Sequence, residues 1–220
     1  MSGITSGSTE IRAFAEADRA GLRELFGLAG EGAPSGSLWG HEESEAAVYL
    51  DPYMNLEPSS LFVAAVDGAL VGYLAGCLDN STFPTESERV EAAVREHRLI
   101  FRPRAAAFFV RAAADVAWSA LRREPTAGDF DDARWPAHLH VNVAPEARGT
   151  GVADGLMGRW LDRLRETGSS GCHLQTLVEN TRAVRFFERV GFARHGPTPL
   201  VPGLRYGGGR LHQQTMVWSP

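Results

Sequence analysis

The segment VNVAPEARGTGVADG, residues 141–155, places an arginine inside a glycine-rich turn. An alternating apolar stretch precedes this turn and an amphipathic stretch follows it, which predicts a strand, a loop and the start of a helix. Backbone N–H groups at a helix start are unpaired and partly positive, so they bind phosphate well. Gly149 and Gly151 would let the backbone approach a phosphate closely, and Arg148 would add a charged contact. An ordinary connecting loop is the alternative that the glycines alone leave open.

Two common phosphate-binding loops do not fit this segment. A dinucleotide-binding GxGxxG fingerprint would need glycine at position 154, where this chain has aspartate, and a carboxylate is unfavourable beside a pyrophosphate. A Walker loop needs a lysine, but all 22 basic residues of this chain are arginines. The lack of lysine also excludes Schiff-base and pyridoxal chemistry.

The elements around the turn predict an α/β protein. Residues 137–144 alternate as a strand, and the helix after the turn is predicted to bury one stripe at i+4 spacing: Val152, Leu156, Trp160 and Leu164. Two apolar stretches flank Asp67-Gly68 and predict a β-hairpin. Residues 172–178 and 211–219 predict further strands, and residues 180–192 predict a short helix that ends at Gly191.

The remaining segments are less regular. A short strand and then a helix with Leu22, Leu25 and Phe26 on one face are predicted near the N-terminus. Residues 30–60 and the Gly/Pro-rich stretch 196–209 are predicted to be rich in loops, and residues 82–135 to form a helical insertion between two strands. Residues 1–9 are expected to be a flexible lead, and residues 10–220 a single domain.

Composition narrows the class of function. A hydrophobic content of 44% with no apolar run of about 18 residues indicates a globular protein without a membrane span. The net charge of −5 argues against nucleic acid as a partner. The N-terminus has no signal-peptide pattern, and Cys77 and Cys172 are expected to be buried thiols, so a cytoplasmic location is predicted. Neither cysteine belongs to a metal-binding motif, so no metal site is predicted.

The turn resembles the coenzyme-binding signature of the GNAT superfamily of acetyl-CoA-dependent N-acyltransferases. That signature is Gln/Arg-x-x-Gly-x-Gly/Ala, and Arg148-x-x-Gly151-x-Ala153 matches it. Residues 10–25, EIRAFAEADRAGLREL, are similar to the opening strand and helix of the family, and NTRAVRFFERVGF, residues 180–192, is similar to its last helix. Residues 60–83, the helical insertion and the signature together resemble, more closely, the acetyltransferase-like domain of eukaryotic O-GlcNAcases and its free-standing bacterial relatives.

The resemblance implies a GNAT fold: a mixed, mostly antiparallel sheet of about six or seven strands flanked by helices, with the helical insertion between the third and fourth strands. It also implies a coenzyme site. Backbone amides of Gly149, Thr150, Gly151, Val152 and Ala153, with Arg148, would bind the pyrophosphate of coenzyme A. Val141, Asn142 and Val143 would pair with the pantetheine arm, and the amide near Val141 would stabilise the oxyanion. Asn180 would contact the pantetheine region and also cap its helix.

Two catalytic groups depart from the family pattern. Many members have a tyrosine seven residues after the asparagine as the general acid, and this chain has Phe187. A coenzyme A thiolate leaves without a proton donor near neutral pH, since thiols of this kind have a pKa of roughly 8.5. The general base is fixed by no motif, and the candidates are Asp79, His140, Asp51 and Tyr53. A structural or surface role is the alternative for each histidine, and a plain turn is the alternative for YLDPY.

The expected function is therefore acetyl transfer from acetyl-CoA, as co-substrate, directly to an amine on a small molecule or a peptide. The acceptor and the oligomeric state are left open. An acyl-CoA-binding pseudoenzyme that acts as a sensor or interaction module is the alternative, because the tyrosine is missing and no base is evident.

Overall fold

The computed structural model describes residues 9–29 and 38–220. The strands are β1 (Thr9–Ala13), β2 (Leu61–Val66), β3 (Ala69–Cys77), β4 (Ala137–Val143), β5 (Cys172–Leu177), β6 (Ala193–His195), β7 (Leu200–Tyr206) and β8 (Gly209–Trp218). The helices are α1 (Arg19–Ala29), α2 (Glu42–Tyr49), α3 (Asp51–Leu56), α4 (Glu86–Glu96), α5 (Pro103–Arg122), α6 (Val152–Glu166) and α7 (Thr181–Arg189).

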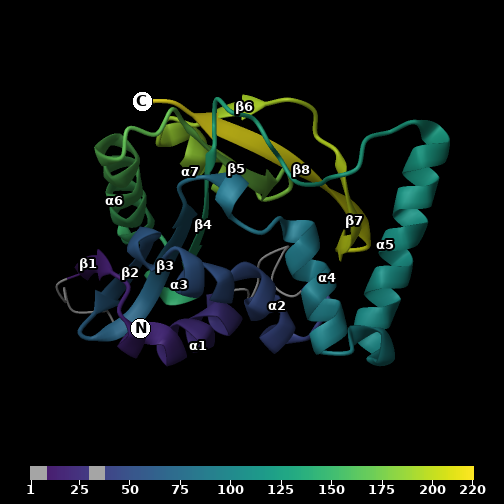
Figure 1. The fold of residues 1–220 in the computed structure, drawn as a ribbon, viewed down its shortest axis with the longest axis horizontal. Coiled ribbons are helices and arrows are strands. Elements are labelled where there is room, and N and C mark those ends of the chain that lie inside the picture. Colours follow the sequence, from purple (N-terminus) through teal and green to yellow (C-terminus); the bar gives the residue numbers. More distant parts are fainter. Residues whose placement is uncertain (1–8, 30–37) are drawn as a thin grey trace.

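The strands form one mixed sheet in the order β1-β2-β3-β4-β5-β8-β6, and β7 pairs with β8 (Figure 1). The predicted hairpin is confirmed: β2 and β3 pair antiparallel and turn at Asp67 and Gly68, both of which have positive φ. Two consecutive positive φ values are typical of the tight turns that match strand twist. Within the described sheet, β4 and β5 are the neighbouring named strands that run parallel.

The β4–β5 pair separates soon after it forms. The strands are in register at Ala137↔Cys172 and at His138↔His173, and no further pairing joins the rest of the two strands. On its other side β4 stays paired with β3 through Val143. The sheet therefore opens between β4 and β5 toward the carboxyl ends of both strands.

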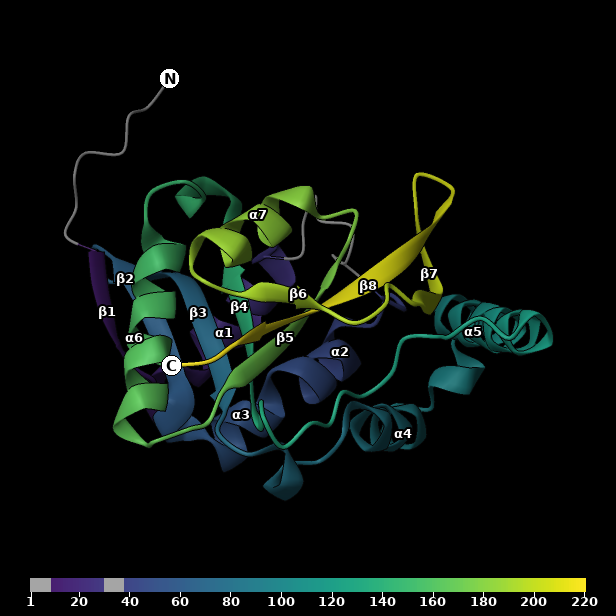
Figure 2. The same cartoon turned by 90° about the horizontal axis from the view of Figure 1, so that it is seen from above.

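Helices cover both faces of the sheet. Figure 2 shows α6 and α7 on one face and α1, α2 and α3 on the other. The predicted stripe of α6 is confirmed, because Val152, Leu156, Trp160 and Leu164 are all buried in the core on the first face. On the second face Leu22 and Leu25 of α1 pack with Tyr53 and Met54 of α3 against β2 and β3. None of the helices in the described part of the chain is long and apolar enough to cross a membrane.

The prediction of a loop-rich segment at residues 30–60 is wrong for its described part. Residues 30–37 lie outside the described residues, but α2 and α3 follow at once. The buried face of α2 includes Ser44 and Glu45, so its hydrophobic periodicity is weak in the sequence. Glu45 is buried because its Oε1 accepts the backbone amides of Trp39 and Gly40 at 2.9 and 2.8 Å. Polar residues with internal partners thus occupy positions where a pattern search expects apolar ones.

Two further elements differ from expectation. The Gly/Pro-rich stretch 196–209 contains β7, whose pairing with β8 turns at Gly207 and Gly208. Thr9, expected in the flexible lead, is the first residue of β1 and pairs with Val66 of β2. Both differences arise because pairing with a distant strand decides the conformation, which local composition does not report.

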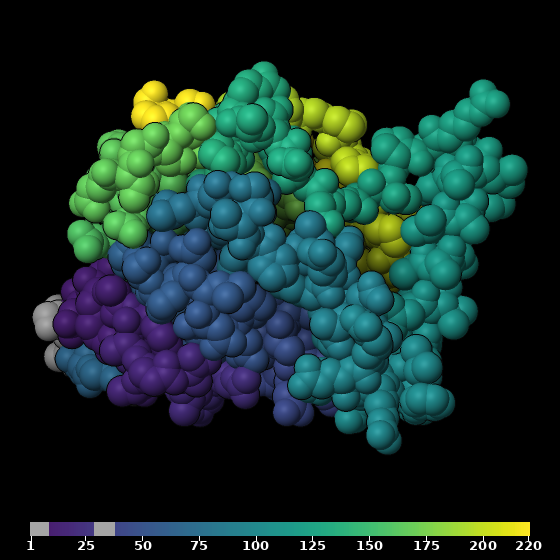
Figure 3. Space-filling view, in the orientation of Figure 1, coloured from purple at the N-terminus to yellow at the C-terminus, as the bar shows by residue number. Residues whose placement is uncertain are grey.

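Helices α4 and α5 lie between β3 and β4 in the chain, where the helical insertion is expected. Helix α5 packs against β7, and its buried Asp115 accepts the Gly203 amide at 2.9 Å and pairs with Arg205 at 2.7 Å. The other side of α5 is exposed, including Val110 and Leu121. In Figure 3 the end of α5 protrudes from the body at the right-hand edge.

Candidate active site

A cavity of ≈ 1090 Å³ opens where β4 and β5 separate. Both strands contribute walls to it, and so do the glycine turn, α7, α2 and the first residue of α4. The residues that line it include His140, Val141, Asn142, Val143, Arg148, Gly149, Gly151, Ala153, Asn180, Phe187, Glu42, Glu45, Tyr49 and Glu86. One cavity thus joins the predicted coenzyme residues to residues of α2 and α4 that no motif connects to them.

The backbone of β4 offers unpaired groups to this cavity. Ala144 N donates to Val71 O on the β3 side, whereas Ala137 N donates to Gly171 O on the β5 side. Backbone groups alternate along a strand, so odd-numbered residues of β4 face away from β3. The amides of Val141 and Val143 therefore point to the side that β5 has left. An extended ligand arm laid there would find the amides of Val141 and Val143 along a strand edge.

The glycine turn ends in the N-terminus of α6. Gly149 and Gly151 have φ of +83° and +89°, a left-handed conformation that favours glycine, and Gly151 precedes the first helical residue, Val152. Nothing lies within 4 Å of where a Cβ would stand at either glycine, so both face open space. The Thr150 hydroxyl donates to Ala147 O at 2.7 Å and Arg148 Nε donates to Val143 O at 3.2 Å, which hold the turn. The turn presents free helix-start amides to the cavity.

Charges along the cavity are separated by element. Arg148, with Arg182, Arg185 and Arg189 of α7, lines it beside the glycine turn. Arg189 pairs with Asp154 of α6 at 2.6 Å, whereas Arg182 and Arg185 have no ion pair among the described residues. Glu42 and Glu45 of α2 and Glu86 of α4 line it from the other wall. A ligand with a phosphate-bearing end and an acceptor with a cationic end would find complementary charge in one cavity.

Helix α7 brings Asn180 and Phe187 to the cavity. Asn180 is the N-cap, and its Oδ1 accepts the Ala183 amide at 3.2 Å, so the capping role predicted for it is present. Phe187 is buried and packs edge-on against Phe186 and at 6.0 Å from Phe192. Its ring lines the cavity but supplies no proton.

Among the four base candidates, His140 lines the cavity and the other three do not. Asp79 is exposed and caps the turn after β3, where it accepts the amide and the hydroxyl of Ser81 at 2.9 and 2.7 Å. These bonds lower the pKa of the Asp79 carboxyl. Asp51 lies in the first turn of α3 and binds Arg23 at 2.5 Å on a different hollow of the surface.

Tyr53 belongs to a partly buried hydrogen-bond network. Its hydroxyl lies 2.7 Å from His138 Nε2, and His138 Nδ1 contacts Asn80 Oδ1. An amide oxygen only accepts, so His138 carries its proton on Nδ1 and accepts from Tyr53 at Nε2. Desolvation raises the pKa of Tyr53 and lowers that of His138, so both side chains are neutral. These hydrogen bonds join α3 to β4 and to the turn after β3.

His140 is a neutral imidazole beside two tyrosine rings. Its ring meets those of Tyr49 and Tyr53 edge-on, with centroids 6.2 and 5.5 Å apart. Desolvation, then the charge of Arg89, lowers the pKa of His140 to about 3. The ring is half-buried and borders the cavity, so water there screens part of this effect. An imidazole held neutral is a hydrogen-bonding group in this wall and a weak proton acceptor.

Tyr49 and Glu86 form a second polar group in the wall. The Tyr49 hydroxyl donates to Glu86 Oε1 at 2.7 Å. Glu86 is held by the start of α4, where Thr85 and Glu88 form a capping box and Asp129 accepts the Glu86 amide at 2.9 Å. Desolvation and the Glu86 charge raise the pKa of Tyr49, so Tyr49 is a neutral donor. Glu86 thus presents a positioned carboxylate to the cavity.

The comparisons with known proteins fit this geometry. Residues 22–192 match the model of the acetyltransferase (GNAT) family. The chain belongs to the GNAT acetyltransferase family. Over 53 residues it is 38% identical to N-alpha-acetyltransferase 30 of Schizosaccharomyces pombe. That stretch is 24% of this chain, and it covers about a third (35%) of the yeast protein's length.

Solved structures share the GNAT fold across nearly the whole chain. SsHAT has a TM-score of 0.61 at 22% identity, covering 96% of this chain and 98% of its own. YncA of Salmonella typhimurium, whose structure contains its cofactor acetyl-CoA, has a TM-score of 0.59 at 16% identity, with coverages of 96% and 93%. Ribosomal-protein-alanine N-acetyltransferase of Brucella melitensis has a TM-score of 0.57 at 19% identity, with coverages of 96% and 99%. At these identities the likeness shows the fold.

Two cavity residues of this GNAT protein, Tyr49 and Glu86, were absent from the sequence candidates. Tyr49 stands two residues before Asp51 in a stretch that seemed to be loop, so its side-chain direction was unknown. Glu86 opens the helical insertion and is more than fifty residues from the glycine turn. Its sequence signal was the capping box Thr85–Glu88, which marks a helix start but not what the helix faces.

Proposed function

We propose that this GNAT protein transfers an acetyl group from acetyl-CoA directly to an amine. The pyrophosphate of the coenzyme would bind the amides from Gly149 to Ala153, with Arg148 and the α7 arginines beside it. The pantetheine arm would lie along Val141–Val143 as an added strand, near Asn180. The observation that carries this proposal is that the β4 edge and the helix-start amides border one cavity.

The acetyl carbonyl would lie beside the Val141 amide, which points to the cavity side of β4. An amine that attacks the thioester carbon forms the C–N bond and pushes charge onto the carbonyl oxygen, and this amide would stabilise that charge. Collapse then breaks the C–S bond, and coenzyme A leaves as a thiolate. Phe187 gives no proton to it, so solvent protonates the thiol afterwards.

Glu86 is our candidate for the general base, acting directly or through one water. Tyr49 donates to one carboxylate oxygen, Oε1, and no side chain among the described residues donates to the other, Oε2. An amine enters as a cation, so Glu42, Glu45 and Glu86 would attract it before Glu86 takes its proton. His140 would remain a neutral wall residue. The acceptor class that fits is a cationic amine on a small molecule or a peptide.

We also propose, from the resemblance of residues 60–83 and the helices after them, that the chain is a free-standing relative of the acetyltransferase-like domain of O-GlcNAcases. The chain has the glycine turn, which we propose binds coenzyme A. A cytoplasmic location is part of this proposal, and the buried thiols of Cys77 and Cys172 suit a reducing compartment.

Calorimetric titration with acetyl-CoA tests the coenzyme site. Gly151→Asp puts a carboxylate where the pyrophosphate is proposed to bind, so binding should be lost. Any side chain at Gly151 is also strained, and Gly168→Asp is the matched control, because Gly168 has φ of +67° at the far end of α6 with open space around it. Wild-type affinity in folded Gly151→Asp protein would show that coenzyme A binds elsewhere.

A further inference from the structure

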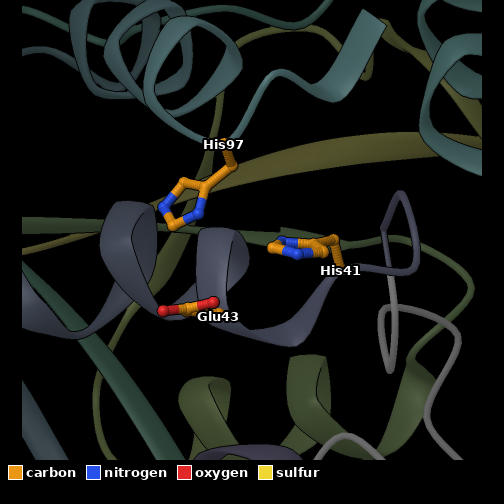
Figure 4. A group of neighbouring side chains, drawn as sticks. All are labelled: His41, Glu43 and His97. Carbon is orange, nitrogen blue, oxygen red and sulfur yellow. The ribbon is translucent and has the colours of Figure 1, made fainter. Parts of the chain in front are cut away.

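Three potential metal ligands meet on the surface between α2 and α4. The nitrogen and oxygen ligand atoms of His41, Glu43 and His97 all lie within 4.8 Å of one another. Figure 4 shows the two imidazoles and the carboxylate facing a common space. The histidine rings are 5.3 Å apart between centroids and tilted by 54°, so they are not stacked on each other.

The backbone holds these three residues in place. His41 is the N-cap of α2, Glu43 lies in the first turn of α2, and His97 is the C-cap of α4. The His97 amide donates to Ala93 O at 3.0 Å, and Arg102 Nε donates to His97 O at 3.2 Å. Glu45 fixes the chain before α2 by accepting the amides of Trp39 and Gly40. The distance between the ligands is therefore set by how α2 packs on α4.

We propose that His41, Glu43 and His97 bind one divalent transition-metal ion of the zinc, cobalt and nickel class. Two imidazoles and one carboxylate are a ligand set that these ions accept, and the remaining position would hold water. Ligand distances of about 2.0–2.2 Å require the side chains to close on the ion from their present separation. All three are at least partly exposed, so side-chain rotation can supply this movement.

Two sources of negative charge favour a cation at this place and offset the Arg102 guanidinium that is bonded to His97 O. The C-terminal carbonyls of α4 end at His97, and a helix C-terminus carries partial negative charge. Glu43 and Glu96 line one small hollow with His97, and the cation in that hollow, Arg23, is paired with Asp51. The positive end of α2 opposes the ion, but Glu42, Glu43 and Glu45 all lie in its first turn.

Binding at His41 exchanges one interaction for another. His41 Nδ1 accepts the Ser44 amide at 3.3 Å. An ion on Nδ1 would displace this hydrogen bond. An ion on Nε2 would move the imidazole proton to Nδ1, which could then no longer accept the amide. The hydrogen bond is long for an amide donor, and Ser44 Oγ keeps its own bond to His41 O at 2.8 Å. Metal binding therefore loses one weak cap and retains the rest of the turn.

The ion would join two walls of the large cavity. Helix α2 carries Glu42, Glu45 and Tyr49 to that cavity, and α4 carries Glu86. At one place these helices are joined by the Tyr49–Glu86 hydrogen bond, and the ion would join them again at the start of α2 and the end of α4. Metal binding itself does not depend on the proposed function. The expectation of no metal rested on motif spacing, whereas His41 and His97 meet through the fold.

The test is calorimetric titration of chelator-treated full-length protein with zinc chloride, with cobalt absorbance as a second readout. Wild-type protein should bind one ion per chain. Glu43→Gln and His97→Gln should each weaken binding by roughly ten-fold or more, because each removes a ligand. Glu166→Gln, at the end of α6, and His212→Gln, in β8, are controls, since they remove the same groups away from the cluster, and they should bind zinc as wild-type does.

Cobalt should give the absorbance of a low-coordinate complex with nitrogen ligands, and this band should disappear in His97→Gln. Absence of zinc binding by the wild-type protein would overturn the proposal. Wild-type zinc affinity in both Glu43→Gln and His97→Gln would overturn it as well. If His97→Gln does not fold, Glu43→Gln and the cobalt band still decide it. Acetyl-CoA binding is measured separately in Gly151→Asp, so failure of either proposal leaves the other measurable.

Discussion

The Tyr49 hydroxyl donates to Glu86 Oε1 across 2.7 Å, and this contact joins α2 to the first turn of α4 in the cavity wall. The two side chains are 37 residues apart in sequence, so the contact exists only when both helices are packed. It leaves Glu86 oriented by a neutral donor. That orientation is what a general base needs if it is to meet an amine in one position.

Glu86→Gln keeps the shape of the side chain and removes its ability to take a proton. The rate of acetyl transfer should fall by roughly 10² or more, the usual range for a lost general base, while acetyl-CoA still binds. Tyr49→Phe should cost about 1 kcal/mol, or roughly five-fold in rate. Steady-state kinetics with an amine acceptor measures both. Glu91→Gln, on the exposed side of the same helix, is the control, and a Glu86→Gln rate equal to that control would remove Glu86 from catalysis.

Arg148→Ala tests the charged contact beside the glycine turn. The loss should weaken acetyl-CoA binding by about 1–2 kcal/mol, or roughly five- to thirty-fold, as expected for a charge-assisted bond to phosphate. Calorimetry measures the affinity, and dephospho-coenzyme A should still bind because the pyrophosphate is the anchor. Arg148 also donates to Val143 O, so a loss of cooperative thermal unfolding in the variant would mark a structural arginine instead.

Phe187→Tyr restores the hydroxyl that many relatives carry at this position. The rate should change no more than a few-fold, because a thiolate with a conjugate-acid pKa of roughly 8.5 leaves without a donor near neutral pH. A pH–rate profile compares the two proteins. A rate gain of roughly ten-fold or more near neutral pH would contradict this expectation and show that departure of the thiolate needs a proton donor.

The free energy of unfolding should fall on mild acidification because three desolvated imidazoles are held neutral in the folded protein. Desolvation lowers the pKa of His138, His140 and His173, that of His140 to about 3 from an ordinary 6.5. The unfolded chain then binds more protons than the folded one below pH 6.5, so stability is full above that pH and falls toward pH 3. Each fully desolvated imidazole gives at most about 1.4 kcal/mol per pH unit, and His140 less because it borders the cavity.

Urea unfolding between about pH 7 and 5.5 isolates this effect, because carboxylates with lowered pKa values, such as Asp115, contribute only where the unfolded carboxyl takes up protons, near its ordinary pKa of about 4. His140→Gln should reduce the slope, and His212→Gln, on the surface, should keep it. A pH-independent free energy of unfolding across the window would show that these histidines are not held neutral.

Much of the fold follows from local sequence. The Asp67-Gly68 turn, the stripe from Val152 to Leu164 and Gly191 after α7 were predicted because each depends on residues within one or two turns. The glycine turn was found for the same reason. Its two glycines have positive φ, a conformation that favours glycine, so the residue type itself indicates the turn.

The cavity wall opposite the glycine turn could not be predicted in this way. Helix α2 buries Ser44 and Glu45, which satisfy backbone and Trp39 donors, so its pattern does not appear amphipathic. Asp79 was a reasonable base candidate by its place after β3, but its carboxylate caps a turn. Which carboxylate faces the cavity is decided by the packing of α4, a contact between distant segments.

Release of free thiol from acetyl-CoA separates a transferase from a protein that only binds the coenzyme. Purified protein is supplied with acetyl-CoA and a panel of mono-amines, diamines and peptides, and Gly151→Asp serves as the control. The transferase function predicts thiol release above the control with at least one cationic amine, at a rate that rises with pH as the amine loses its proton, and loss of that release in Glu86→Gln. Binding of acetyl-CoA, seen as a raised melting temperature, without thiol release from any amine would contradict it and indicate a sensor instead.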